Sequence, residues 1–131
     1  MKYRIESDSI GELKVNADAY YGVQTQRAID NFDISRIKVS DYPEMVKALG
    51  MVKLAAARAN YDLGLLPKDI FKAMEDACKR VIAGEFDKEF PVDLIQGGAG
   101  TSTNMNANEV IANIALESLG KEMGDYKTVS P

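Results

Sequence analysis

The stretch from Ile95 to Asn108, IQGGAGTSTNMNAN, decides how the last third of the chain folds. Glycines at positions 97, 98 and 100 allow the backbone to turn tightly and to approach a ligand closely. Four side chains that can form hydrogen bonds follow in succession: Thr101, Ser102, Thr103 and Asn104. Apolar residues at helical spacing begin shortly afterwards, so the stretch is interpreted as a glycine loop that leads into a helix.

That helix is predicted to run from about Asn106 to Leu119, with Gly120 just beyond its last turn. Asn106 and Glu109 have the spacing of a capping box, with Asn in the role that Ser or Thr usually fills. One face of the helix is expected to be buried, and it carries Val110, Ile111, Ile114, Ala115 and Leu119.

Two further helices are predicted upstream, one from Pro43 to Gly64 and one from Pro67 to Gly84. Because the link between them is short, they should pack as a helical hairpin. The first is expected to bury Met45, Val46, Leu49, Val52, Ala56, Ala59 and Leu63, and the second Ile70, Phe71, Met74, Ala77, Cys78, Val81 and Ile82.

The N-terminal part shows weaker signals. Strand-forming residues between Arg4 and Val15 flank a turn sequence at Ser9 to Gly11, which predicts a short β-hairpin. Gln24 to Ile29 is expected to form a short helix, and Phe86 to Asp93 a loop or extended stretch. The predicted fold is mainly α, a single domain over residues 1–131 with a short N-terminal β-hairpin.

Composition excludes several classes of function. A net charge of -4 and a pI near 4.9 argue against a nucleic-acid-binding protein, which normally has a basic face. The N-terminus lacks the apolar core of a signal peptide and no apolar run is long enough to cross a bilayer, so a cytoplasmic location is expected. With one cysteine, Cys78, no disulfide can form within the chain, and a buried structural thiol is predicted.

Histidine is absent from the sequence. Its absence excludes Ser-His-Asp and Cys-His nucleophilic systems within the chain and removes the commonest metal ligand. No other set of residues has metal-ligand spacing, so no metal site is predicted.

The glycine loop and the helix start after it suit an anion. Helix N-termini present free N–H groups and a partial positive charge, and hydroxyl and amide side chains add directional donors. The alternative is a glycine-rich turn followed by an ordinary N-cap, for which Ser, Thr and Asn are favoured locally. The stretch is neither a Walker loop nor a dinucleotide fingerprint, because no Lys follows the last glycine and no βαβ unit surrounds it.

Two blocks of the sequence resemble the aspartase/fumarase superfamily. The run GGAGTSTNMNANEVIAN, residues 97–113, is similar to its first signature region, and DAYYGVQTQRAIDNF, residues 18–32, to a second block. Three details favour the aspartase branch over class II fumarases: Tyr21 where fumarases have Trp, Ala99 where they have Ser, and Ile114 where they usually have Arg. The resemblance covers residues 4–126 and implies the helical N-terminal domain of that fold.

The resemblance implies an aspartate ammonia-lyase activity, the reversible elimination of ammonia from L-aspartate to give fumarate. It implies that Thr101 contacts a substrate carboxylate, with Ser102, Thr103 and Asn104 as supporting residues, although Asn104 could instead fix the loop. Arg27 is the other candidate, because a guanidinium can pair bidentately with a carboxylate. The alternative for Arg27 is a solvated side chain or a salt bridge between segments.

The same resemblance implies that no cofactor is needed and that no catalytic group lies in this chain. The family's Ser-Thr-Asn segment, its Thr-His pair and its serine loop with the general base lie elsewhere, and its active sites combine three subunits of a homotetramer. The chain alone is therefore expected to be inactive. Two alternatives remain at this point: a class II fumarase, and a helical structural or interaction domain without catalysis.

Overall fold

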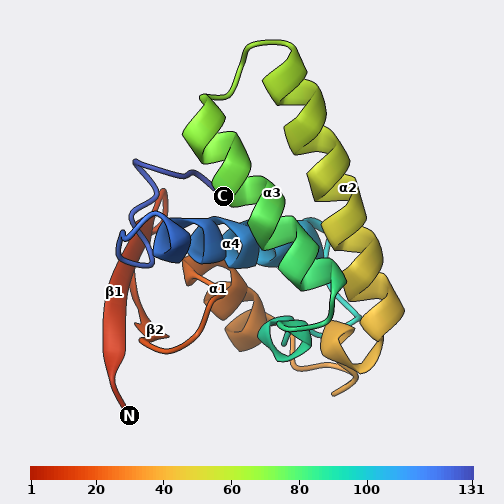
Figure 1. The fold of residues 1–131 in the computed structure, drawn as a ribbon. Coiled ribbons are helices and arrows are strands. Elements are labelled where there is room, and N and C mark those ends of the chain that lie inside the picture. The colour runs from red at the N-terminus through yellow and green to blue at the C-terminus, as the bar shows by residue number, and fades with distance from the viewer.

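The computed structural model describes all residues from 1 to 131 and is mainly α, as predicted. A central helix, α4, is surrounded by the other elements (Figure 1). In chain order the elements are β1 (Tyr3–Asp8), β2 (Gly11–Asn16), α1 (Val23–Asn31), α2 (Pro43–Asp62), α3 (Lys68–Ile82) and α4 (Thr101–Ser118), with short 3-10 turns at Val39–Asp41 and Asp87–Glu89.

The N-terminal hairpin is confirmed. β1 and β2 pair antiparallel, with Tyr3 opposite Asn16 and Asp8 opposite Gly11. The Asp8 carboxylate holds the turn, since its Oδ1 accepts hydrogen bonds from the backbone N–H groups of Ile10 (2.9 Å) and Gly11 (3.2 Å). Gly11 has a φ of 138°, a conformation that side chains disfavour, so this turn requires glycine.

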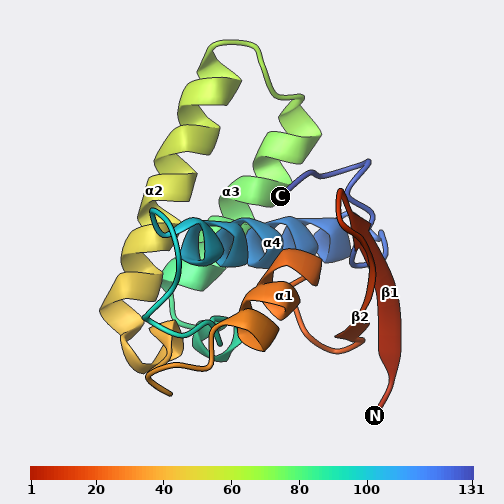
Figure 2. The same ribbon diagram turned by 180° about the vertical axis from the view of Figure 1, so that it is seen from behind.

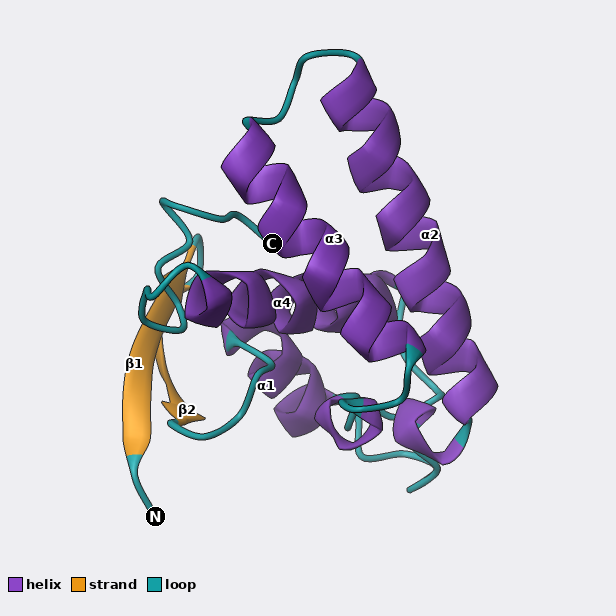
Figure 3. Cartoon of the chain, in the orientation of Figure 1, coloured by secondary structure: helices purple, strands orange, loops and turns teal.

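The predicted hairpin of α2 and α3 is also confirmed, and the two helices diverge toward the loop that joins them (Figure 3). They approach closely at Gly50, where an added Cβ would lie 2.9 Å from Cγ1 of Ile82. Toward the open end the rings of Tyr61 and Phe71 stack, with centroids 4.3 Å apart. The absence of a side chain at Gly50 therefore brings α2 and α3 together at one end, and aromatic rings fill the wider end.

The predicted buried face of α2 is confirmed in part. Val46 is buried and Leu49 packs against the core, but Val52 is 62% exposed and Leu63 72% exposed. The other fully buried positions of α2 are Gly50 and Ala57, because small residues there allow close packing against α3 and α4. The apolar positions of α2 thus cover more of its circumference than the chain buries.

The last helix differs from the prediction in two ways. It begins at Thr101 rather than near Asn106, and it is buried on nearly all sides between Ala107 and Leu116 instead of on one face. The capping box is wrong, because Asn106 and Glu109 lie inside the helix and are both fully buried. The physical reason is that Gly100, in the left-handed region at φ 81°, ends the loop directly before Thr101.

Cys78 is fully buried in α3, as predicted, and burial raises the pKa of its thiol to about 11. Gly120, at φ 70°, follows α4 in the position predicted for it. None of the helices combines the length and the apolar character that a bilayer span needs.

Candidate functional site

The start of α4 is open to solvent. Residues 97–100 form an exposed loop in which Gly98 and Gly100 have φ of 74° and 81°. The helix forms its first backbone bond from the N–H of Asn104 to the carbonyl of Gly100 (3.1 Å). The N–H groups of Thr101 and Ser102 have no acceptor within the chain, so they remain available to an anion from outside.

The four predicted polar residues therefore form the first turn of the helix rather than the loop before it. Thr101 is exposed, Ser102 is half-buried, Thr103 is buried and Asn104 is exposed. Thr101 and Ser102 lie at the open end of the helix, where their hydroxyls accompany the two free N–H groups. Thr103 and Asn104 are engaged by other parts of the chain.

Gln96 engages Thr103. Its Oε1 accepts a hydrogen bond from the Thr103 N–H (3.0 Å), and its Nε2 donates to Thr103 Oγ1 (2.6 Å). The same Nε2 donates to the backbone carbonyl of Asp93 (2.8 Å). One side chain thus joins the beginning of the glycine loop to the first turn of α4.

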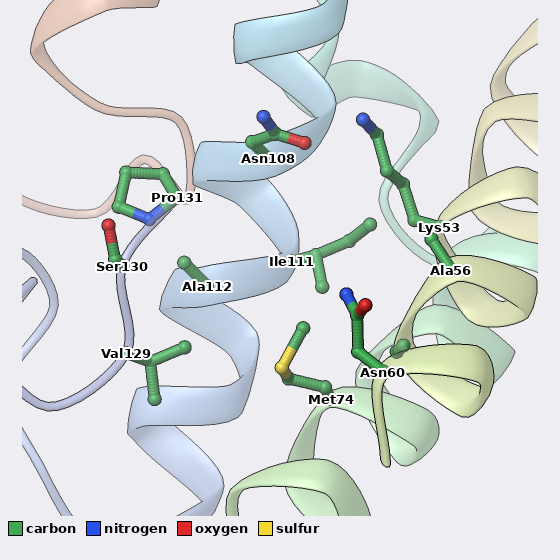
Figure 4. A pocket seen from close by; sticks show the side chains of 11 residues that line it. Lys53, Ala56, Asn60, Met74, Asn108, Ile111, Ala112, Val129, Ser130 and Pro131 are labelled. Atoms are coloured by element: carbon green, nitrogen blue, oxygen red, sulfur yellow. The ribbon is translucent and has the colours of Figure 1, made fainter. Parts of the chain in front are cut away.

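Asn104 is engaged by Lys53 of α2, whose Nζ donates to its Oδ1 (2.5 Å). A groove of about 170 Å³ lies along the same face of α4, between α2, α3 and the C-terminal segment (Figure 4). Lys53, Asn60, Asn108 and Ser130 supply its polar groups, and the other lining side chains are apolar. The pairing with Lys53 supports the structural alternative for Asn104.

Asp93 anchors the N-terminal side of the glycine loop. Its carboxylate accepts hydrogen bonds from the N–H groups of Ser35 (2.8 Å), Arg36 (2.9 Å) and Ile95 (2.8 Å), and from Ser35 Oγ (2.7 Å). Burial alone would raise the pKa of Asp93, but these donors outweigh it and hold the pKa well below its usual range. Arg36 adopts a φ of 60° to reach this carboxylate.

Arg27 lies on α1 and is paired within the chain. Its Nε and Nη2 bind the Asp8 carboxylate at 2.9 Å each, and Nη2 also donates to the Gly11 carbonyl (2.9 Å). The structure thus shows the inter-segment salt bridge. The hairpin that Arg27 binds lies beside the C-terminal half of α4, whereas the glycine loop enters the opposite end (Figure 1, Figure 2). Within this chain, Arg27 is not brought together with Thr101.

The N-terminus of α1 is closed, because the Glu109 carboxylate, from the middle of α4, accepts the hydrogen bonds of its free N–H groups. Oε2 of Glu109 accepts from the N–H groups of Gly22 (2.9 Å) and Thr25 (3.0 Å) and from Thr25 Oγ1 (2.6 Å). Oε1 accepts from the Gln24 N–H (2.8 Å). Burial raises the pKa of Glu109, although the bonds from Thr25, Gln24 and Gly22 act in the other direction.

A second carboxylate lies at the same helix end. Glu6 from β1 accepts from the Val23 N–H (2.8 Å) and from the Tyr126 hydroxyl (3.1 Å). Burial and the nearby carboxylates raise the pKa of Tyr126, so its hydroxyl acts as a donor. A Cβ on Gly22 would lie 2.2 Å from Tyr126 Oη and 2.6 Å from Glu6 Oε2, so only glycine fits between these groups.

Sequence reasoning missed Gln96, Asp93 and Gly22, and it assigned Glu109 to a capping box that the structure does not contain. Glu109 had a signal, since a carboxylate in the middle of an otherwise apolar helix face needs buried donors. Gly22 had one too, as a glycine at the start of a helical pattern. Gln96 and Asp93 had none, because neither side chain differs in the sequence from an ordinary polar loop residue.

The open end of α4 can bind an anion through hydrogen-bond donors alone, without a charged side chain. It offers the N–H groups and hydroxyls of Thr101 and Ser102, together with the partial positive charge of an 18-residue helix. The structure contains no group of three or more Asp, Glu or Cys side chains that could hold a metal ion.

Comparison with known proteins gives consistent results. A family model described as "Lyase" matches residues 11–130. Aspartate ammonia-lyase of Pseudomonas aeruginosa is 60% identical over 98% of the chain, and that of Escherichia coli 54% identical over 98%. Fumarate hydratase class II of Halobacterium salinarum is 59% identical over 94% of the chain. The chain spans 26–27% of the length of these curated relatives.

Solved structures share the fold. The cobalt-bound crystal structure of fumarate lyase:delta crystallin from Brucella melitensis is similar at a TM-score of 0.97 and 52% identity, over 99% of this chain and 28% of that one. Class II fumarase from Schistosoma mansoni is similar at a TM-score of 0.88 and 36% identity, over 94% of this chain and 26% of that one.

Proposed function

This chain belongs to the lyase family, and we propose that it is the N-terminal domain, residues 1–131, of an aspartate ammonia-lyase. The parent enzyme would eliminate ammonia reversibly from L-aspartate to give fumarate. Within it, the open end of α4 would form one wall of the site for a substrate carboxylate. Several aspartate ammonia-lyases among the similar proteins support this assignment.

The observation that carries the proposal is the pair of free N–H groups at Thr101 and Ser102. The difficult step in this elimination is the removal of a proton from the carbon beside the β-carboxylate, which forms a doubly charged aci-carboxylate. A catalyst must therefore stabilise negative charge where it develops. Donors fixed by a helix and by a hydrogen-bonded loop need little reorganisation at that moment.

The roles of the individual residues follow from their surroundings. Thr101 is the proposed carboxylate contact, because it is exposed at the first helical position and its N–H is free. Ser102 would add a second donor. Thr103 and Asn104 would support the site indirectly, through Gln96 and Lys53.

For Arg27 the resemblance implies a role either in activity or in the architecture of the site. Its pairing with Asp8 and Gly11 supports the architectural role. Arg27 would then hold the hairpin against α1, and direct pairing with substrate would require it to leave Asp8.

The family resemblance implies that the groups that act as acid and base would come from the remainder of the parent protein. We propose, from the family resemblance, that the parent is a cytoplasmic homotetramer whose active sites combine several subunits. The 131-residue chain alone would then not turn over aspartate, and turnover by the purified chain would contradict this.

A steady-state assay of the full-length parent tests the function. With L-aspartate we expect formation of fumarate, followed by the ultraviolet absorbance of its double bond, together with release of ammonia. In the reverse direction, fumarate should be consumed only when ammonia is present.

Class II fumarase is the second candidate, because the relative from Halobacterium salinarum is 59% identical to this chain, which lies between the 60% and 54% of the aspartate ammonia-lyases from Pseudomonas aeruginosa and Escherichia coli. Ala99 and Tyr21, where fumarases have Ser and Trp, favour the aspartase assignment. A parent that hydrates fumarate to malate and ignores ammonia would establish the second candidate instead.

A further inference from the structure

Gln96 controls which donors of α4 remain free. Three N–H groups of the first turn lack a backbone acceptor within the helix, those of Thr101, Ser102 and Thr103. The Oε1 of Gln96 takes the third, at 3.0 Å. What remains is a pair of adjacent N–H groups, which matches the two oxygens of one carboxylate.

Gln96 also closes the glycine loop. Its Nε2 reaches forward to Thr103 Oγ1 (2.6 Å) and back to the Asp93 carbonyl (2.8 Å). Residues 97–100 make no long-range backbone pair, so this side chain fixes the distance between the two ends of the loop. Asp93 is itself held by Ser35, Arg36 and Ile95, so the glycine loop is tied to the segment that follows α1.

The chemistry of the side chain is as informative as its position. A carboxylate is the stronger group for capping a helix N-terminus, because it interacts favourably with the helix dipole. The chain uses carboxylates of this kind at the N-terminus of α1, where Glu109 and Glu6 both accept N–H groups. At the start of α4 it uses a neutral amide, which leaves the positive potential there uncancelled.

We propose that Gln96 is a positioning residue for substrate: it selects the Thr101 and Ser102 N–H groups and keeps fixed negative charge away from the site. The inference rests on the proposed function, since it takes the open end of α4 as the site of a substrate carboxylate. Gln96 itself contacts the helix and the loop and does not touch the substrate.

Gln96→Glu in the full-length enzyme tests this role, because it preserves the shape of the side chain and adds one negative charge. It also loses the Nε2 donor to the Asp93 carbonyl, a loss that it shares with the Gln96→Met variant described below. We expect KM for L-aspartate to rise roughly tenfold, with a smaller change in kcat and a melting temperature within a few degrees of the wild type. Raising the salt concentration should reduce the KM defect, because salt screens the added charge. Gln24→Glu, the same charge change at an exposed position of α1, is the control and should leave KM unchanged.

Gln96→Met separates position from charge. It keeps the length of the side chain but removes its three hydrogen bonds, so KM should rise without the salt dependence seen for Gln96→Glu. A Gln96→Glu enzyme with wild-type KM would overturn the proposal. A rise in KM that does not depend on salt and is accompanied by a clear fall in melting temperature would also overturn it.

The wild-type assay run beside these variants keeps the two questions apart. A wild type that ignores aspartate but hydrates fumarate contradicts the aspartase assignment. In that case the KM of Gln96→Glu is compared with the KM of the wild type for malate and fumarate, and this ratio still tests the role of Gln96.

Discussion

The N-termini of α1 and α4 present the same backbone groups but are treated in opposite ways. At α1, Glu109 and Glu6 take the free N–H groups, and both carboxylates are buried. At α4 the chain supplies one neutral acceptor, Gln96, and leaves the N–H groups of Thr101 and Ser102 unpaired beside a glycine loop. A helix end that the chain neutralises itself contributes to the fold, whereas an end left unpaired is available to a ligand.

The glycines at the two ends should respond very differently to a methyl group, and this is the largest effect expected on stability. In Gly22→Ala the Cβ would lie 2.2 Å from Tyr126 Oη, so we expect a loss of about 3 kcal/mol in the free energy of unfolding. In Gly97→Ala the nearest atom, in the Phe32 ring, lies at 3.4 Å, and stability should change little.

Urea denaturation of the full-length variants measures both effects. Equal stability of Gly22→Ala and Gly97→Ala would show that the end of α1 is not tightly packed. That result would remove the distinction between a closed and an open helix end.

Acid should weaken the anchor of the open end. The pKa of Asp93 is lower in the folded protein than in the unfolded chain, so its stabilising contribution is present above the unfolded value, about 4, and is lost as the pH falls below it. Asp93→Asn should therefore be less stable than the wild type at pH 7, and the difference should narrow toward pH 3. Denaturation midpoints at the two pH values measure it, and a constant difference would contradict the assigned role of the carboxylate.

The smallest effect is expected at Arg27, whose guanidinium binds Asp8 through two nitrogens. Arg27→Lys keeps the charge but loses the paired geometry, so we expect a slight fall in melting temperature with kcat/KM unchanged. A rise in KM at unchanged stability would instead place Arg27 in the substrate site.

The sequence was informative where neighbouring residues determine structure. The β-hairpin, α2 and α3 could be predicted because their turn residues and apolar spacing are local signals. The start of α4 could not be predicted, because the residues of its first turn, Thr101 to Asn104, are all polar and show no apolar residues at helical spacing. The buried face of α2 was also misjudged, since Val52 and Leu63 are apolar but exposed.

The candidate site was predictable in part for the same reason. The side chains of Thr101 and Ser102 could be named as donors from the glycine loop before a helix, but their free N–H groups could not, because the helix was predicted to start near Asn106. The closed end of α1 depends on Glu109, which binds Gly22 across 87 residues of sequence. In the sequence alone Glu109 matches a capping box with Asn106, and its partners at the start of α1 are too far away along the chain to be recognised.

A pair of matched substitutions, Thr101→Ala and Thr25→Ala in the full-length enzyme, tests the central contrast most directly. Thr101 lies in the first turn of α4 and is exposed, whereas Thr25 lies in the first turn of α1 and donates to Glu109 at 2.6 Å. Thr101→Ala should lower kcat/KM by about 100-fold without loss of stability. Thr25→Ala should cost about 2 kcal/mol of stability and leave kcat/KM of the folded enzyme unchanged. Thr101→Ala removes the hydroxyl and keeps the backbone N–H, so wild-type kcat/KM in this variant would contradict the assignment of the Thr101 hydroxyl as a carboxylate contact at the open end of α4.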